Sequence, residues 1–190
     1  MTSKNDFIEE AGVIEREGIQ DLLDYLIKET DFFIAPASTK YHGAEELGLV
    51  IHSLTVHDIM KELNETMDCK ITKESMAICG LFHDVCKTNY YVKEKRNKKV
   101  DGKWEEVVVW GVEDQLPMGH GEKSVYIINK FMKLNDDEAL AIRWHLNGFD
   151  PGVHFNYPSG FAQKQAMRDN KIVALLATAD IAASYLIDRW

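Results

Sequence analysis

The amino-acid sequence predicts an all-α protein with one inserted β-hairpin, and three observations support this fold class. Apolar residues recur at helical spacing in several long segments, as Leu22, Leu23 and Leu26 do. Residues with helix-capping side chains precede two of these segments. One Asp-Gly pair, Asp101 and Gly102, separates two β-prone runs, which is a hairpin signal. The 190 residues suffice for a single domain with a core of its own.

Six helical segments are expected along the chain. Thr72 is the expected N-cap of the third helix, and Asn135 with Glu138 three positions later has the pattern of a capping box. The hairpin is expected at residues 90–112. Residues 147–168 contain several Gly and Pro residues, which predicts a loop. The helices are expected at residues 5–30, at 44–64, at 73–86, from about residue 121, at 136–146 and at about 169–188.

The composition limits the classes of function. The chain carries 22 basic and 31 acidic residues, a net charge of -9, which argues against broad, sequence-independent binding to a nucleic-acid backbone. An acidic chain suits a site that gathers divalent cations. No apolar run is long enough to cross a bilayer, and no signal-peptide core follows the N-terminus, so a cytoplasmic protein with no membrane contact is expected. The three cysteines form no CxxC pair and are expected to be buried free thiols.

Three helical segments place metal-ligating side chains among apolar residues. His83 and Asp84 follow directly after a run of small and apolar residues, and Asp180 lies in an almost wholly apolar stretch. A buried carboxylate needs a partner, which is a metal ion or a basic residue. His52 lies in the middle of the second helix. A single histidine in such a position is more often a core residue than a metal ligand. Together these residues supply nitrogen and oxygen ligands that suit Mn, Fe, Co, Ni, Zn or Mg, and the lack of cysteine ligands disfavours a structural zinc site.

The ordered set His52, His83-Asp84 and Asp180 resembles the signature of the HD-domain superfamily of metal-dependent phosphohydrolases. Residues 40–44 and 48–53 are similar to a narrower branch, which includes the HD domain of bacterial 3′-to-5′ exoribonucleases and small phage-type HD proteins. The resemblance covers roughly residues 35–188. It implies an HD-domain helical bundle, with residues 1–34 as an N-terminal helix and connector and the whole chain, 1–190, as a single HD domain.

The resemblance also implies a set of ligands and roles. In HD proteins with two metals the ligand order would be His52, His83, Asp84, His120, His145 and Asp180, with Asp84 bridging two divalent transition-metal ions. The alternative is one ion, with His120 and His145 as a substrate contact and a general acid. Asp84 and Lys87 are the expected catalytic residues. Four further side chains are candidate phosphate contacts, each with a surface salt bridge as its alternative: Lys40, His42, Lys123 and Arg143.

Two histidines and the hairpin have less certain roles. His57 is off the face of His52 and is expected to be a structural or a surface residue, and His154 could reach the cleft from its loop. The hairpin is preferably a solvated element whose aromatic face packs against the body; a surface that binds single-stranded nucleic acid, a lid and an oligomer contact are the alternatives. It combines a basic cluster with aromatic residues: Lys93, Lys95, Arg96, Lys98, Lys99 and Lys103, with Tyr90, Tyr91, Trp104 and Trp110.

The function expected first is hydrolysis of a phosphate ester or anhydride of a nucleotide by a metal-activated water. A 3′-to-5′ exonuclease or phosphodiesterase that acts on the end of a short single strand is the close alternative. A di-iron oxygenase of the HD superfamily and a non-catalytic nucleotide-binding module are further alternatives. The expected partner is therefore a small phosphorylated substrate, and the sequence leaves the oligomeric state open.

Overall fold

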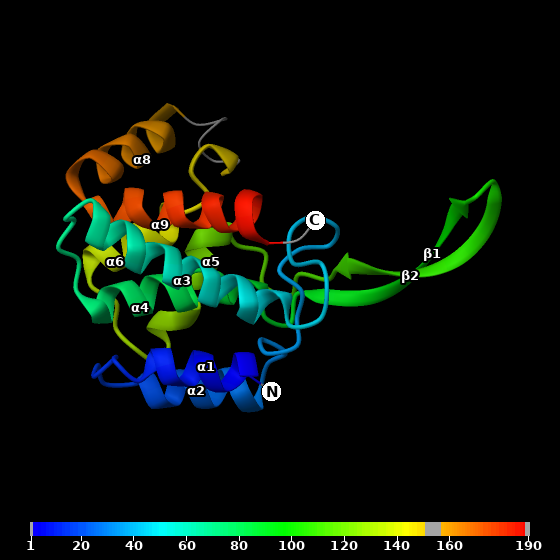
Figure 1. Cartoon of the computed structure of the whole chain (residues 1–190), viewed down its shortest axis with the longest axis horizontal. Helices are drawn as coiled ribbons and strands as arrows, with labels where there is room; N and C mark the ends of the chain where they lie inside the picture. The colour runs from blue at the N-terminus through cyan, green and yellow to red at the C-terminus, as the bar shows by residue number, and fades with distance from the viewer. Residues whose placement is uncertain (1, 151–156, 189–190) are drawn as a thin grey trace.

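The computed structural model describes residues 2–150 and 157–188, and it confirms an all-α fold with one inserted hairpin (Figure 1). His154 lies outside the described residues. The central helices pack on one another between a layer formed by α1 and α2 and, on the opposite side, α8. The α-helices are α1 Thr2–Ala11, α2 Ile19–Lys28, α3 Gly48–Thr66, α4 Lys73–Phe82, α5 His120–Asn129, α6 Asp136–Trp144, α8 Tyr157–Asp169 and α9 Lys171–Ala182.

Two predicted caps are confirmed. The Thr72 side chain accepts a hydrogen bond from the backbone N–H of Ser75 at 3.1 Å, at the start of α4. Asn135 and Glu138 form a reciprocal capping box at the start of α6. Each pair satisfies backbone donors that have no partner within the helix. The sequence therefore located the beginnings of both helices correctly.

The single helix predicted over residues 5–30 is wrong, because the chain breaks into α1 and α2. Gly18 has a φ of 89°, in the left-handed region where glycine is favoured. A Cβ at Gly18 would also lie 1.9 Å from the carbonyl oxygen of Phe131. The break thus depends on a close approach between two distant parts of the backbone, which helical spacing of apolar residues does not reveal.

The loop predicted over residues 147–168 is also wrong in part. The short 3₁₀ turn η2, Asn147–Phe149, follows α6, but α8 covers Tyr157–Asp169. Pro158 stands in the first turn of α8, where proline costs no intrahelical hydrogen bond. The side chains of Gln163 and Ala166 are buried. Packing of α8 against α9 and α6 therefore outweighs the loop-forming composition of this segment.

One helix ends earlier than predicted, and another reaches its predicted end but changes type in its last turn. The helix expected at 73–86 ends at Phe82, and the chain passes through His83 and Asp84 into a 3₁₀ turn, η1 Val85–Lys87. The last helix continues beyond α9 as a π-helical turn, η3 Ala183–Ile187. Single π-helical turns are rare and occur frequently at functional sites.

The inserted hairpin consists of β1, Tyr91–Val100, and β2, Lys103–Val112, paired antiparallel. It extends away from the helical body (Figure 1). The side chain of Trp104 is 73% exposed, so the preferred interpretation, an aromatic face packed against the body, is wrong for this residue. At its root the hairpin packs on the body, where the Tyr91 hydroxyl donates a hydrogen bond to the Ala37 carbonyl at 3.1 Å.

The core joins the N-terminal helices to the rest of the chain. Phe7 of α1 is fully buried, and its ring lies 5.5 Å from the ring of Phe82, at the end of α4. Arg16, between α1 and α2, forms ion pairs with Glu74 and with the buried Glu138. These contacts hold α1 and α2 against α4 and α6.

No single helix in the described ranges is long and apolar enough to cross a membrane. Residues Gly160–Asp169 and Lys171–Ile187 reach the required length and hydropathy only as a pair, and a bend of 107° separates the two.

Candidate metal centre

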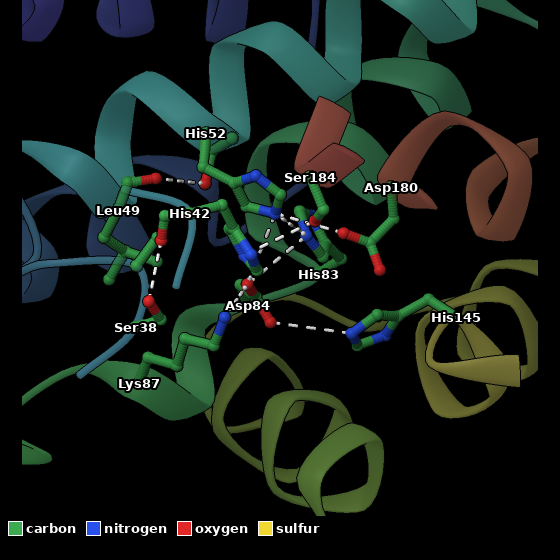
Figure 2. A network of polar contacts seen from close by, with 12 residues as sticks. Ser38, His42, Leu49, His52, His83, Asp84, Lys87, His145, Asp180 and Ser184 are labelled. Atoms are coloured by element: carbon green, nitrogen blue, oxygen red, sulfur yellow. Dashed lines mark hydrogen bonds and ion pairs between the residues drawn. The ribbon is translucent and has the colours of Figure 1, made fainter. Parts of the chain in front are cut away.

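The six predicted ligands come together in one buried site, and Asp84 lies at its centre. Figure 2 shows the side chains of His52, His83, His145 and Asp180 directed toward Asp84. They reach the site from separate elements: α3, the ends of α4 and α6, and α9. The residues are buried, apart from a partial exposure of His120.

One carboxylate oxygen of Asp84 faces the first group of ligands. Asp84 Oδ2 lies 3.5 Å from His83 Nε2 and 3.6 Å from His52 Nε2. His52 Nε2 in turn lies 3.1 Å from Asp180 Oδ1 and 3.3 Å from His83 Nε2. The same oxygen is 2.6 Å from the Lys87 ammonium. His52, His83 and Asp84 thus offer ligand atoms that all lie within 4.8 Å of one another, and Asp180 adjoins them through His52.

The other oxygen of Asp84 faces a second group of ligands. Asp84 Oδ1 lies 2.7 Å from His120 Nε2 and 3.5 Å from His145 Nε2. The rings of His120 and His145 are 5.1 Å apart, and the ring of His145 is 4.9 Å from that of His83. The two oxygens of one carboxylate are thus directed to two different sets of histidines.

Close packing of α3 against α4 brings His52 and His83 together. Gly80 on α4 lies so near α3 that a Cβ on it would be 2.7 Å from the Cα of His57. A glycine at this crossing lets the two backbones approach each other. His83 stands at the C-cap of α4, so the same approach positions its ring next to His52.

Backbone carbonyls orient two of the histidines. His83 Nδ1 lies 2.9 Å from the Gly80 carbonyl, and His145 Nδ1 lies 2.7 Å from the Ile142 carbonyl. A carbonyl can only accept a hydrogen bond, so Nδ1 carries the proton in both rings and Nε2 presents its lone pair to the site. Metal-ligating histidines typically have a partner of this kind on the second nitrogen.

His145 gives the best test of whether these residues fit a metal ion. Its Nε2 is buried and makes no hydrogen bond among the described residues, although it faces Asp84 Oδ1. A lone pair directed at a carboxylate oxygen is unfavourable unless a cation lies between them. With one lone pair on each imidazole and two carboxylates, the donor set suits a divalent transition-metal ion. The residues present therefore fit a divalent transition-metal ion.

The charges of the site follow from burial and close partners. Burial lowers the pKa of His83 to about 3, so this ring is neutral. Burial raises the pKa of Asp84, but Lys87 and His83 outweigh it and hold that pKa well below the ordinary value. Asp180 and Asp188 outweigh burial and raise the pKa of His52 to about 9. Cys86, followed by Asp84, outweighs burial and raises the pKa of His120 to about 10. Binding of divalent ions would have to displace these protons.

The sequence missed two polar neighbours of the ligands. Asp188 Oδ2 lies 2.7 Å from His52 Nδ1, on the residue that follows η3. Cys86 is a buried free thiol, as predicted, but its Sγ lies 3.3 Å from His120 Nδ1. Asp188 could have been noticed, because it follows Asp180 by eight positions, close to two helical turns. Nothing in the sequence distinguishes Cys86 from an ordinary core cysteine.

A cavity of about 420 Å³ opens onto the cluster. Asp84, Asp180 and Lys87 lie at its base, and three exposed aromatic residues lie around it: Phe149, 63% exposed, Tyr185, 52%, and Tyr41, 50%. Phe149 and Tyr185 stack on each other with their ring centroids 6.3 Å apart. The remaining lining residues are His42, Leu146, Ile181 and Ser184.

The four candidate phosphate contacts are separated by the fold. His42 lines the cavity, and its ring lies 5.0 Å from that of His52. Lys40 is exposed and lies over the ring of Tyr41, beside the cavity. Lys123 pairs with Asp114 at 2.6 Å and lines a separate small cavity with His120. Arg143 forms ion pairs with Glu122 and Asp150 and does not line the cavity that opens onto the cluster.

The predicted structural role of His57 fits its position. It is buried near Glu10 of α1, with Nδ1 3.5 Å from the Glu10 carboxylate and without a hydrogen bond. Burial lowers the pKa of His57 to about 4. The ring is therefore neutral at pH 7 and belongs to the packing of α1 on α3.

Comparison with known protein families gives one match. Residues 49–183 match the family model of the HD domain, which is more than two thirds of the chain. The chain belongs to the HD domain family. Family membership confirms the resemblance deduced from His52, His83-Asp84 and Asp180, all of which lie within the match. HD domain proteins are mostly metal-dependent hydrolases and bind divalent metal ions. Neither a curated protein nor a solved structure gave a match.

Proposed function

We propose that this HD domain protein is a two-metal phosphohydrolase that cleaves a phosphate ester or anhydride of a nucleotide. The observation that carries the proposal is the division of the Asp84 carboxylate between two sets of histidines. His52, His83 and Asp180 would hold one ion with Oδ2, and His120 and His145 would hold the other with Oδ1. When bound, such ions activate a water molecule and neutralise charge on the phosphoryl group.

Lys87 would stabilise the phosphoryl oxygens. Burial disfavours a charged lysine, but the Asp84 carboxylate outweighs burial and raises the pKa of Lys87 above its ordinary value. Lys87 is therefore protonated at neutral pH, and it lies at the base of the cavity. A fixed positive charge in a site of low water content stabilises negative charge that develops in the transition state.

The surroundings of the cavity support a nucleotide as the substrate. Its volume of about 420 Å³ falls within the range of small-ligand sites. The exposed rings of Tyr41, Phe149 and Tyr185 offer surfaces on which a nucleobase could stack while the phosphate reaches Asp84 and Lys87. Exposed aromatic side chains next to buried ionic groups match a ligand with an aromatic ring and a phosphate.

Elemental analysis of the purified protein, combined with a phosphate-release screen of nucleotides in Mn²⁺, tests the proposal. About two equivalents of transition metal and phosphate release from a nucleotide would support it. One equivalent would assign His120 and His145 to roles other than metal binding. Metal without phosphate release would favour a strand-end nuclease or an oxygenase. Cleavage of short oligonucleotides would identify the nuclease, and oxygen uptake would identify the oxygenase. A protein that binds no metal after incubation with Mn²⁺ would contradict the proposal.

A further inference from the structure

The hairpin is a two-stranded ribbon without a third strand. β1 and β2 each have ten residues, and the structure describes no other strand in residues 2–150 and 157–188. The ribbon extends away from the helices, so most of it has no support from the core (Figure 1). Isolated two-stranded hairpins are at best marginally stable in water. A ribbon of this length is better explained if one of its edges is paired.

The hydrogen-bond pattern shows which groups face outward from β2. Glu113 donates its backbone N–H to the carbonyl of Tyr90 at 3.0 Å, and these residues are opposite one another when the register is extended by one pair. Hydrogen-bonded and non-hydrogen-bonded pairs alternate along an antiparallel ladder. Every second residue of β2, counted from Glu113, therefore bonds to β1, and the residues between them turn their N–H and C=O groups outward, away from β1. The side chains of these five residues share one face of the ribbon: Trp104, Glu106, Val108, Trp110 and Val112.

The two edges of the ribbon differ in charge. β1 has five basic residues and one glutamate, a net charge of +4, whereas β2 has one lysine and two glutamates, a net charge of -1. Basic side chains on an edge strand prevent it from pairing with another copy of itself. Four of the five outward-facing residues of β2 are apolar, with Glu106 the exception, and three of these four are exposed: Trp104 is 73% exposed, Val108 63% and Val112 47%. The β2 edge is therefore the one open to pairing.

We propose that β2 pairs antiparallel with β2 of a second copy of this chain, to form a four-stranded sheet about a two-fold axis. With Val108 on the axis, Trp104 lies opposite Val112 of the second copy, and Lys103 lies opposite Glu113. Glu106 lies opposite Trp110 in this register, so no like charges face each other across the junction. Each outward N–H and C=O of β2 gains a backbone partner.

The distribution of charge favours a second copy over a nucleic acid. The net charge of the whole chain is -9, and residues 91–112 carry +2 of it. The rest of the chain therefore has a net charge of -11. Contact through the ribbons keeps the two acidic bodies apart. Three of the basic side chains also form exposed ion pairs within the chain, where Lys93 pairs with Glu46, Lys95 with Glu106 and Arg96 with Glu94.

Proline at the two edges provides a matched test. Val108→Pro removes an outward-facing N–H from β2, and Asn97→Pro removes an outward-facing N–H from β1; neither interrupts the ladder between the strands. The mass of the full chain in solution would be measured by light scattering and sedimentation over a range of concentrations. We expect a dimer for the wild type and for Asn97→Pro, and at least a tenfold higher dissociation constant for Val108→Pro.

A second variant protects the test against local unfolding. Val108→Glu sets a carboxylate opposite Lys95 in the same hairpin, which favours the ribbon, but sets two carboxylates against each other at the proposed axis. It should also be monomeric, with unchanged helical circular dichroism and metal content. A monomeric wild type, a Val108→Glu protein that remains dimeric, or an Asn97→Pro protein that dissociates as readily as Val108→Pro would each overturn the proposal.

Discussion

At the scale of single residues, the site depends on the carboxylate of Asp84, which faces both groups of histidines. Asp84→Asn keeps the shape of the side chain and removes its charge and one acceptor oxygen. Because both proposed ions share this carboxylate, we expect metal content to fall toward zero and nucleotide hydrolysis to fall to background, with the helical circular dichroism unchanged. Metal analysis and phosphate release measure the two losses; a variant with wild-type metal content and activity would refute the site assignment.

Lys87 differs from the ligands because its proposed role concerns the phosphoryl group. Lys87→Met removes the positive charge 2.6 Å from Asp84 Oδ2 and keeps most of the side-chain volume. We expect kcat to decrease by roughly 100- to 1,000-fold, as for the loss of one transition-state contact, while metal content stays the same. Lys87→Arg should restore part of kcat. If Lys87→Met loses its metal in parallel with its activity, Lys87 supports the ligands instead.

At the scale of elements, the α3–α4 crossing positions His52 next to His83. Gly80→Ala would introduce a methyl group 2.7 Å from the Cα of His57, a backbone atom that cannot turn aside. Overpacking of this kind costs about 1–3 kcal/mol, which exceeds the ~1 kcal/mol that alanine gains over glycine in a helix. Urea denaturation should therefore show a less stable protein. Gly148→Ala, where a Cβ meets no atom within 4 Å, is the matched control and should change stability little.

Packing of α1 on α3 makes stability depend on pH through His57. Its pKa is about 4 in the folded chain and 6.5 when unperturbed, so the unfolded state binds the proton more readily. Stability should be complete above pH 6.5 and decrease as the pH falls toward 4, by roughly 2 kcal/mol between pH 7 and pH 5. Urea denaturation of the wild type and of His57→Met at both pH values isolates this contribution. Equal pH dependence in the two proteins would show that His57 does not titrate as expected.

At the scale of the whole molecule, metal binding and folding should be coupled, because the ligands come from separate elements. Only the folded chain brings His52, His83 and Asp180 together, so ions bind the folded state in preference. An ion at 100 times its dissociation constant stabilises the fold by about 2.7 kcal/mol. For a chain of this size, this corresponds to an increase in Tm of roughly 5–10 °C.

Thermal denaturation with Mn²⁺ and with a chelator would measure the increase. Asp84→Asn serves as the control, since it should show no difference between the two conditions. An equal Tm with and without the ion in the wild type would contradict the coupling. A dimer formed by β2 would add a dependence of Tm on protein concentration, which distinguishes the two contributions.

The sequence by itself determined the features that depend on neighbouring residues. Thr72 and Asn135 mark helix starts because caps act within one helical turn, and Asp101-Gly102 marks the hairpin because turn geometry is local. His83-Asp84 and Asp180 were recognisable as candidate ligands because charged groups among apolar residues need partners. The resemblance to the HD superfamily, now confirmed for residues 49–183, followed from these residues and their order.

Only the tertiary structure decided the features that depend on distant contacts. The break at Gly18 requires the backbone of Phe131 beside it, and α8 forms because α6 and α9 bury one of its faces. The division of Asp84 between two sets of histidines needs coordinates, since residues separated by more than 30 positions meet at each oxygen. Asp188, which follows the π-helical turn η3, meets His52 although 136 positions separate the two residues. Local patterns name the chemical groups, but long-range packing sets the distances between them, and those distances determine the chemistry.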